Sequence, residues 1–110
     1  MDYNQLSTPP ACYADLCLVP IGTGKASIVA EVAEVERFLK TCGLKYVMHS
    51  CGTTIEGKWD DVMEVIGKAH AVVHQLGVAR IQSSIRVGTR TDKQETMEGK
   101  VEHVKTLASE

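Results

Sequence analysis

Several residue types that impose strong structural constraints are scarce in this 110-residue sequence, and each scarcity excludes a class of protein. The four cysteines form no C-x-x-C pair and no dense pattern, which argues against a disulfide scaffold and favours reduced thiols. The formal net charge is −2, so there is no basic excess for binding a nucleic acid backbone. No apolar run is long enough to span a bilayer, and the start lacks the pattern of a signal peptide. We therefore expect a cytoplasmic protein that binds neither nucleic acid nor membrane.

The chain length predicts one domain. Hydrophobic residues make up 44% of the sequence and charged residues 24%, which is ordinary for a globular protein. Pro9 and Pro10 follow Ser7 and Thr8, and such a stretch continues neither a helix nor a central strand. We predict a disordered leader over residues 1–12 and a single domain over residues 13–110.

Hydrophobic periodicity predicts the elements of this domain. A continuous apolar run at 14–21 is typical of a central strand, and amphipathic helices are expected from residue 28 to Gly43 and from residue 59 to Gly77. Between the helices, residues 45–51 and 53–56 form a hairpin turning at Gly52, and 79–87 alternates clearly as a strand. A third helix follows Asp92-Lys93-Gln94-Glu95, which has the form of a capping box.

The order strand-helix-strand, strand-helix-strand, helix is that of an α+β, ferredoxin-like βαββαβ sandwich with an extra C-terminal helix. In this fold both helices of the repeat cover one face of a four-stranded antiparallel sheet. With Ile81, Ile85 and Val87 on the helix side, strand alternation sends Ser84 and Arg86 to the open face. Thr54 and Glu56 join them if Ile55 is in the core, whereas His49 and Cys51 are assigned to the core face.

The open face combines polar groups with the apolar first strand, and such a surface is normally covered. A second subunit, a ligand, or both at a subunit boundary would cover it, and the small core also favours association. We therefore expect a homo-oligomer.

The glycine loop Gly22-Thr23-Gly24-Lys25 lies between a strand and a helix, where phosphate-binding loops occur. The Walker pattern fails because Val19 stands in place of its first glycine and Ala26 in place of the Ser or Thr after the lysine. We interpret the loop as a turn leading to an N-cap at Ser27.

Three strings of residues are distinctive in combination. They are Val19-Pro20-Ile21-Gly22; Gly52-Thr53-Thr54-Ile55-Glu56-Gly57 with Trp59-Asp60-Asp61-Val62-Met63; and Ile85-Arg86-Val87-Gly88 with Arg90 and Asp92. Together they resemble the thiamine-binding-protein family, the YkoF-like group, over about residues 14–107. The resemblance implies a ferredoxin-like subunit, assembly through the sheets into dimers and then tetramers, and binding of thiamine or its pyrimidine moiety without catalysis.

Thiamine joins an aminopyrimidine to a cationic thiazolium, and several side chains suit it. A carboxylate such as Glu56 would accept from the aminopyrimidine or balance the cation, and Trp59 or Tyr46 would offer a cation–π surface worth about 0.5–2 kcal/mol. Arg86 and Arg90 would suit a phosphate ester, or pair with acidic residues. The full set of predicted ligand-binding residues is Ser50, Thr53, Thr54, Glu56, Trp59, Ser84, Arg86 and Arg90.

We predict no catalytic residue, no metal site and no cofactor. His70 and His74 are spaced i, i+4 but have no evident third ligand, and His49 and Cys51 are neighbours on one strand face, a spacing that does not generally allow a hydrogen bond. The leading hypothesis is a non-catalytic binding protein for thiamine or a related pyrimidine or thiamine phosphate. The alternatives are an assembly or regulatory module without a ligand, and a small enzyme acting on a phosphorylated metabolite.

Overall fold

The computed structural model describes residues 1–93 and 96–109. After a single 3₁₀ turn at Tyr3–Gln5, the elements follow in the predicted order. They are β1 (Cys12–Ile21), α1 (Val29–Leu39), β2 (Lys45–His49), β3 (Gly52–Gly57), α2 (Trp59–Gln75), β4 (Arg80–Gly88) and α3 (Met97–Ala108). Cys12, the last residue assigned to the predicted leader, begins β1 and is buried.

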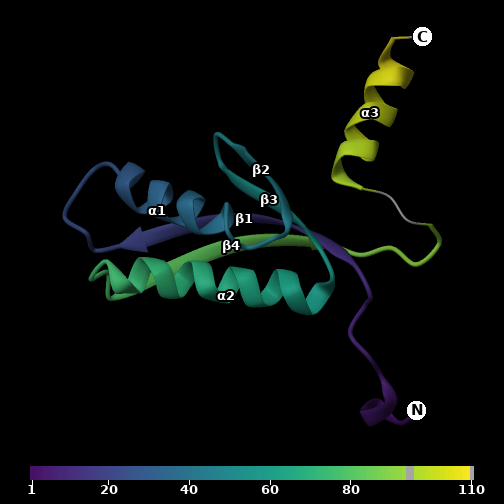
Figure 1. Ribbon diagram of the computed structural model, residues 1–110, viewed down its shortest axis with the longest axis horizontal. Coiled ribbons are helices and arrows are strands. Elements are labelled where there is room, and N and C mark those ends of the chain that lie inside the picture. Colours follow the sequence, from purple (N-terminus) through teal and green to yellow (C-terminus); the bar gives the residue numbers. More distant parts are fainter. Residues whose placement is uncertain (94–95, 110) are drawn as a thin grey trace.

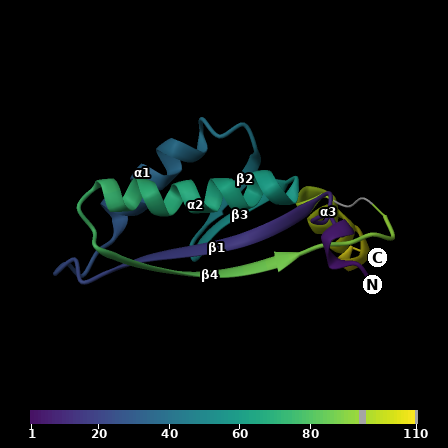
Figure 2. The same cartoon turned by 90° about the horizontal axis from the view of Figure 1, so that it is seen from below.

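The four strands form one antiparallel sheet in the order β2-β3-β1-β4. Helices α1 and α2 lie on the same side of this sheet, and α3 projects from one end (Figure 1; Figure 2). The predicted ferredoxin-like fold with an added C-terminal helix is confirmed. Within the described part of the chain, no helix is both long and apolar enough to cross a membrane.

The core lies between the sheet and the two helices. Ile55 and Val62 are fully buried there, and burying a side chain of this size contributes about 1.5–3 kcal/mol. The close packing of β3 against β1 requires a glycine at position 52, since a Cβ at Gly52 would lie 2.2 Å from the backbone oxygen of Leu16. Gly52 thus has a role in strand pairing besides its place at the turn.

The strand faces agree with the predicted alternation on β3 and β4 but not on β2. Leu16 of β1 pairs with Ile85 on the helix side, and Asp15 pairs with Arg86 on the open side. On β2, Tyr46 lies opposite the buried Ile55 and therefore faces the helices. Val47 and His49 alternate with Tyr46, so they point to the open face. The assignment of His49 to the core was therefore wrong, because the weak apolar alternation of β2 did not reveal its register.

Helix α1 is capped differently from the prediction, and its buried face includes a glutamate. Its N-cap position is Ile28, and the hydroxyl of Ser27 accepts from the amide of Val29 at 3.3 Å. Val29 is 72% exposed, whereas Glu31, Val35 and Leu39 are buried. These three residues are spaced by four and share one face of the helix, so a glutamate occupies a position facing the core.

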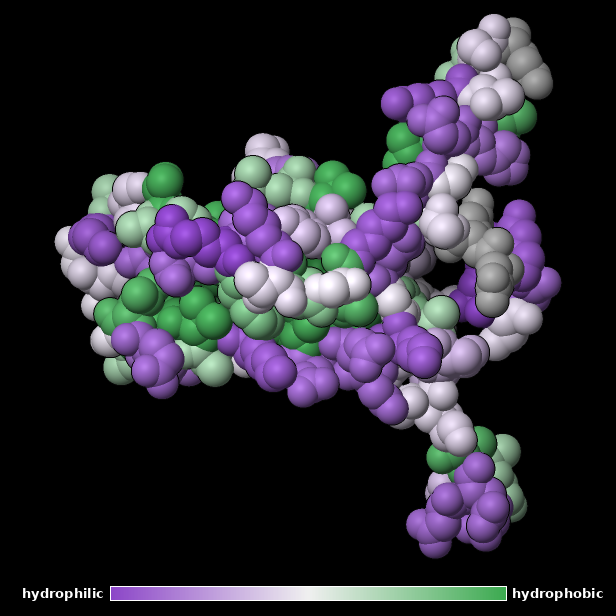
Figure 3. Space-filling view, viewed as in Figure 1, coloured by the Kyte–Doolittle hydropathy of each residue, from purple (hydrophilic) through white to green (hydrophobic). Residues whose placement is uncertain are grey.

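Helix α3 is capped by Thr96, whose hydroxyl accepts from the amide of Gly99 at 2.9 Å. Two residues of the predicted capping box, Gln94 and Glu95, lie outside the described residues. The apolar stripe of α3 is exposed, since Val101, Val104 and Leu107 retain 52%, 60% and 55% of their accessible surface. Figure 3 shows this helix standing apart from the rest of the molecule with apolar and hydrophilic residues both at its surface.

Candidate functional site

The open face of the sheet carries side chains from all four strands. By register, Tyr13, Asp15, Cys17 and Val19 of β1 stand at its centre, between β3 and β4. The open-face residues on the neighbouring strands are Lys45, Val47 and His49 of β2, Gly52, Thr54 and Glu56 of β3, and Arg80, Gln82, Ser84, Arg86 and Gly88 of β4. Two of the apolar members, Val19 and Val47, are 41% and 48% exposed. The face therefore combines exposed apolar surface with charged and hydroxyl groups.

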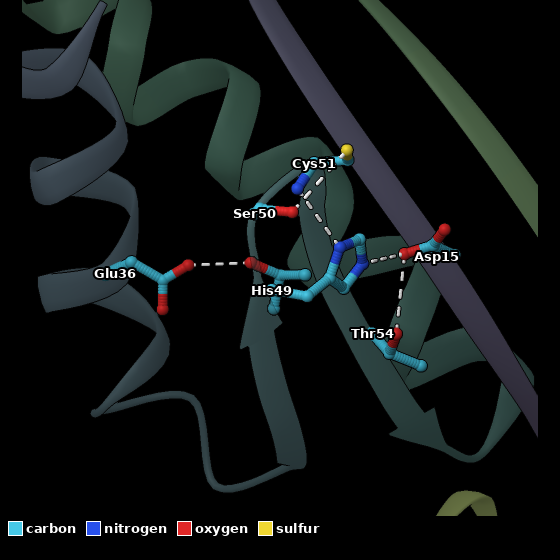
Figure 4. A network of polar contacts seen from close by, with 7 residues as sticks. Asp15, Glu36, His49, Ser50, Cys51 and Thr54 are labelled. Carbon is cyan, nitrogen blue, oxygen red and sulfur yellow. Dashed lines mark hydrogen bonds and ion pairs between the residues drawn. The ribbon is translucent and has the colours of Figure 1, made fainter.

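A hydrogen-bonded group at the middle of this face centres on Asp15. Its Oδ1 lies 2.6 Å from Nε2 of His49 and accepts from the hydroxyl of Thr54 at 3.4 Å. Figure 4 shows the imidazole of His49 between Asp15 and the backbone amide of Cys51. The Asp15 and His49 side chains are 46% and 38% exposed, so they form a half-exposed polar cluster that a ligand could reach.

The hydrogen bonds of His49 define its neutral tautomer. Nδ1 accepts from the amide of Cys51 at 3.2 Å, so this nitrogen carries no proton. Nε2 then carries the hydrogen and donates to Asp15. Both ring nitrogens are engaged in holding the β2–β3 turn against β1, and neither is directed at the thiol of Cys51, whose sulfur lies 3.8 Å from the hydroxyl of Ser50. This geometry does not provide a base for a nucleophile.

The predicted hydroxyl residues are distributed over both faces of the sheet. Thr54 and Ser84 lie on the open face, and Ser50 lies in the β2–β3 turn beside it. Thr53 lies on the helix side, 5% exposed, and donates to Oε1 of Glu36 on α1 at 2.7 Å. A ligand on the open face would therefore not contact Thr53, and alternation along β3 is the reason.

Glu56 lies at the end of the open face where α3 begins. Its Oε2 accepts from the amide of Met97 at 2.8 Å, so the carboxylate satisfies one of the free amides of the α3 N-terminus. Nearby, Lys45 pairs with Glu98 of α3 at 2.7 Å, and this hydrogen bond raises the pKa of Lys45 above its ordinary value. The predicted ligand carboxylate is thus also an anchor for α3.

The aromatic side chain on this face is Tyr13. Its ring lies over Gly88 on β4, where an added Cβ would approach the ring to 2.4 Å, and Lys100 lies 5.5 Å from the ring centroid. Trp59 and Tyr46, which the sequence suggested as stacking surfaces, instead pack against the core on the helix side. Asp15, His49 and Tyr13 were missed because only the pairing of the strands brings them together.

The two predicted arginines differ in how they are paired. Arg90 donates through Nε and Nη2 to the two carboxylate oxygens of Asp92, both at 2.7 Å, and this pairing holds the pKa of Asp92 well below its usual range. Arg86 stands opposite Asp15 on the open face and makes no hydrogen bond or ion pair with the described residues. Arg86 is therefore the arginine with donors available to an anionic group.

Other candidate chemistries receive little support. Nε2 of His70 is 2.8 Å from the hydroxyl of Ser83, and Nδ1 of His74 is 2.8 Å from the backbone oxygen of Val78, so the two imidazoles have separate partners. Residues 1–93 and 96–109 contain no group of three or more His, Cys, Asp or Glu that could hold a metal. In the glycine loop, Lys25 pairs with Glu31 at 2.9 Å, so an internal carboxylate already neutralises the lysine.

Known proteins resemble this chain over most of its length. The sequence profile of a family described as thiamine-binding protein matches residues 14–105. A UPF0045 protein of Eremothecium gossypii is 47% identical over 96 residues, covering 87% of this chain and 91% of the relative. A UPF0045 protein of Synechocystis is 49% identical over 92 residues, covering 84% and 75%.

Solved structures show the same fold. A hypothetical protein from Methanocaldococcus jannaschii superposes with a TM-score of 0.79 at 29% identity, covering 87% of this chain and 97% of the other. A Thermotoga maritima protein, described as a candidate thiamine biosynthesis or salvage protein, superposes with a TM-score of 0.74. The match covers 86% of this chain and 99% of the other. The latter is 18% identical, so that likeness supports the fold alone.

Proposed function

This chain belongs to the thiamine-binding protein family, and from that premise we propose that it binds thiamine or a related pyrimidine on the open face of its sheet without catalysing a reaction. The observation that carries this proposal is the open face itself, which holds the cluster of Asp15, His49 and Thr54, the Tyr13 ring over Gly88, and Arg86, which makes no hydrogen bond or ion pair with the described residues. It combines an acceptor, a hydroxyl, an aromatic surface and a free cation within one sheet face.

Each part of the ligand has a matching group. The aminopyrimidine would donate to a carboxylate, either Asp15 or the second oxygen of Glu56, and hydroxyls of Thr54 and Ser84 would complete its hydrogen bonds. The cationic thiazolium would stack on Tyr13. A phosphate ester, where present, would pair with Arg86.

Assembly is part of the proposal. Val19 and Val47 leave apolar surface on the same face as the polar cluster, and a second copy of the chain packed sheet to sheet would cover it. We propose a cytoplasmic homo-oligomer, a dimer of dimers, with the ligand at the edge of the subunit contact. The exposed valines equally support the second candidate, an assembly or regulatory module without a ligand, and the unpaired Arg86 supports the third, a small enzyme acting on a phosphorylated metabolite.

Calorimetric titration with thiamine, thiamine phosphates and hydroxymethylpyrimidine tests the binding function. Saturable heat with at least one of them is expected, and no heat at protein concentrations that reveal micromolar binding would overturn the proposal. Sedimentation of the same samples tests assembly. An oligomer without any heat would favour the assembly module, and turnover of a phosphorylated compound would favour the enzyme.

Neighbouring threonines offer a matched pair of variants. Thr54→Val removes a hydroxyl from the open face and is expected to weaken ligand binding about five- to tenfold, because one hydrogen bond is lost. Thr53→Val removes a hydroxyl from the helix side and should leave the ligand affinity unchanged. If both variants lost the same ligand affinity, or if neither lost any, a site on the open face would be contradicted.

Glu56→Gln separates a ligand role from an interface role. The expected result is weaker ligand binding with the oligomer intact by sedimentation. A dissociated oligomer with unchanged ligand affinity would make Glu56 an interface residue.

A further inference from the structure

Helix α1 begins at the end of the molecule opposite to α3, after the loop that follows β1 (Figure 1). Its first turn carries a buried carboxylate, that of Glu31. The side chain of Glu31 is 5% exposed, and its Oε1 lies 2.9 Å from Nζ of Lys25. Its Oε2 is buried and has no hydrogen-bond partner among the described residues. A buried, unsatisfied carboxylate oxygen is costly to a folded protein, so this position calls for an explanation.

Glu31 also lines a hollow of about 290 Å³. The glycine loop and Lys25 form one side of this hollow, and the turn between α2 and β4 forms the other. Ile21, Leu76 and Val78 supply apolar walls. At about 30 Å³ for each water-sized group, the hollow holds on the order of ten such groups, which is enough for a small ring.

The two charged members of this site differ in exposure. Lys25 is 56% exposed along its side chain and follows a glycine, whereas Glu31 is held in the first turn of α1. The hydrogen bond from Lys25 lowers the pKa of Glu31, so the carboxylate is ionised at neutral pH. Lys25 can therefore swing into water at little cost, provided that another cation takes its place beside Glu31.

We propose that this hollow binds a small organic ammonium ion, whose charged nitrogen replaces Nζ of Lys25 beside Glu31 and whose apolar group packs against Ile21, Leu76 and Val78. The exchange keeps the buried carboxylate paired, and it returns a long, flexible side chain to solvent, where it regains rotamer freedom. An anionic group in the place of Nζ would be repelled by Glu31, and a neutral group in that place would leave the ionised carboxylate without a charged partner.

This site goes beyond the proposed function. None of its residues belongs to the open-face cluster of Asp15, His49 and Thr54, and it lies on a different part of the fold. Glycine amides distinguish the two sites, since Gly22 and Gly77 line the hollow, whereas Gly52 and Gly88 lie in the strands of the open face.

Nuclear magnetic resonance titration of the ¹⁵N-labelled full chain tests the proposal with three probes of similar shape: benzylammonium, benzyl alcohol and benzoate. Benzylammonium is expected to shift the amides of Gly22, Glu31 and Gly77 in a saturable way, at least about tenfold more tightly than either other probe. Benzyl alcohol binding as tightly as benzylammonium, or shifts confined to Gly52 and Gly88, would overturn it.

Variants of the two charged residues sharpen the test. Lys25→Met removes the internal competitor and is expected to tighten benzylammonium binding by about tenfold, a gain that a misfolded variant cannot imitate. The same probe should also raise the thermal midpoint of Lys25→Met more than that of the parent chain. Glu31→Gln should abolish binding, whereas Glu34→Gln, on the same helix and paired with Arg37, should not change it. Unchanged affinity in Lys25→Met, or in Glu31→Gln, would overturn the proposal.

Discussion

Thr53 and Thr54 are consecutive residues of one strand, and their surroundings show how differently the two faces of this sheet are organised. Thr53 is buried under α1 and bonded to Glu36, whereas Thr54 is half-exposed and bonded to Asp15. The helix-covered face is occupied by packed aliphatic side chains, while the open face holds polar groups with unused hydrogen-bonding capacity. The helix-covered face therefore stabilises the fold, and the open face has polar groups that could bind a ligand.

The largest expected effect on the free energy of unfolding comes from truncating one apolar side chain on each face of the sheet. Ile55→Ala removes a fully buried side chain and should lower the free energy of unfolding by about 2–5 kcal/mol, because it leaves a cavity. Val47→Ala, on the open face, should change it by less than about 0.5 kcal/mol in the monomer. Urea unfolding monitored by circular dichroism measures both. Equal losses would show that the open face also contributes to the core.

Two glycine substitutions are expected to change stability by smaller amounts and in opposite directions. Gly52→Ala places a methyl group 2.2 Å from the Leu16 oxygen and should cost about 1–3 kcal/mol by forcing β1 and β3 apart. Gly67→Ala adds a methyl group to α2 where nothing lies within 4 Å, and should stabilise by about 0.5–1 kcal/mol. Thermal unfolding of the two variants checks the signs. A stabilised Gly52→Ala would contradict the close approach of the strands.

The smallest effect concerns the dependence of stability on pH. The pKa of Glu31 is lower in the folded chain than its ordinary value of 4.5, chiefly because of the hydrogen bond from Lys25. The unfolded chain therefore binds more protons below that pH, so the contribution of Glu31 is present above about 4.5 and is lost as the pH falls. Glu31→Gln should flatten the acid side of a plot of unfolding free energy against pH, and Glu34→Gln should not. An unaltered acid slope in Glu31→Gln would mean that its carboxylate is not selectively stabilised in the folded state.

Hydrophobic periodicity correctly predicted which way side chains face where one side of an element is strongly apolar. The alternation of β4 predicted the open-face positions of Ser84 and Arg86, and the helical period after residue 59 predicted α2. It failed on β2, where His49 was placed on the wrong face, and it gave no indication that Glu31 of α1 faces the core. The apolar pattern of β2 is weak, and in α1 the polar side chain of Glu31 lies in the same row as Val35 and Leu39, so contacts with neighbouring elements decided both placements.

The order of apolar runs and turns in the sequence determined the βαββαβ fold, because each run has the period of the element it forms and each connection allows few topologies. Its motifs also indicated the family. Only the tertiary structure brought Asp15, His49 and Tyr13 to one face of the sheet, buried Glu31 beside Lys25, and placed Trp59 and Thr53 on the helix side. These placements depend on strand register and helix rotation, which arise from contacts between residues far apart in the chain.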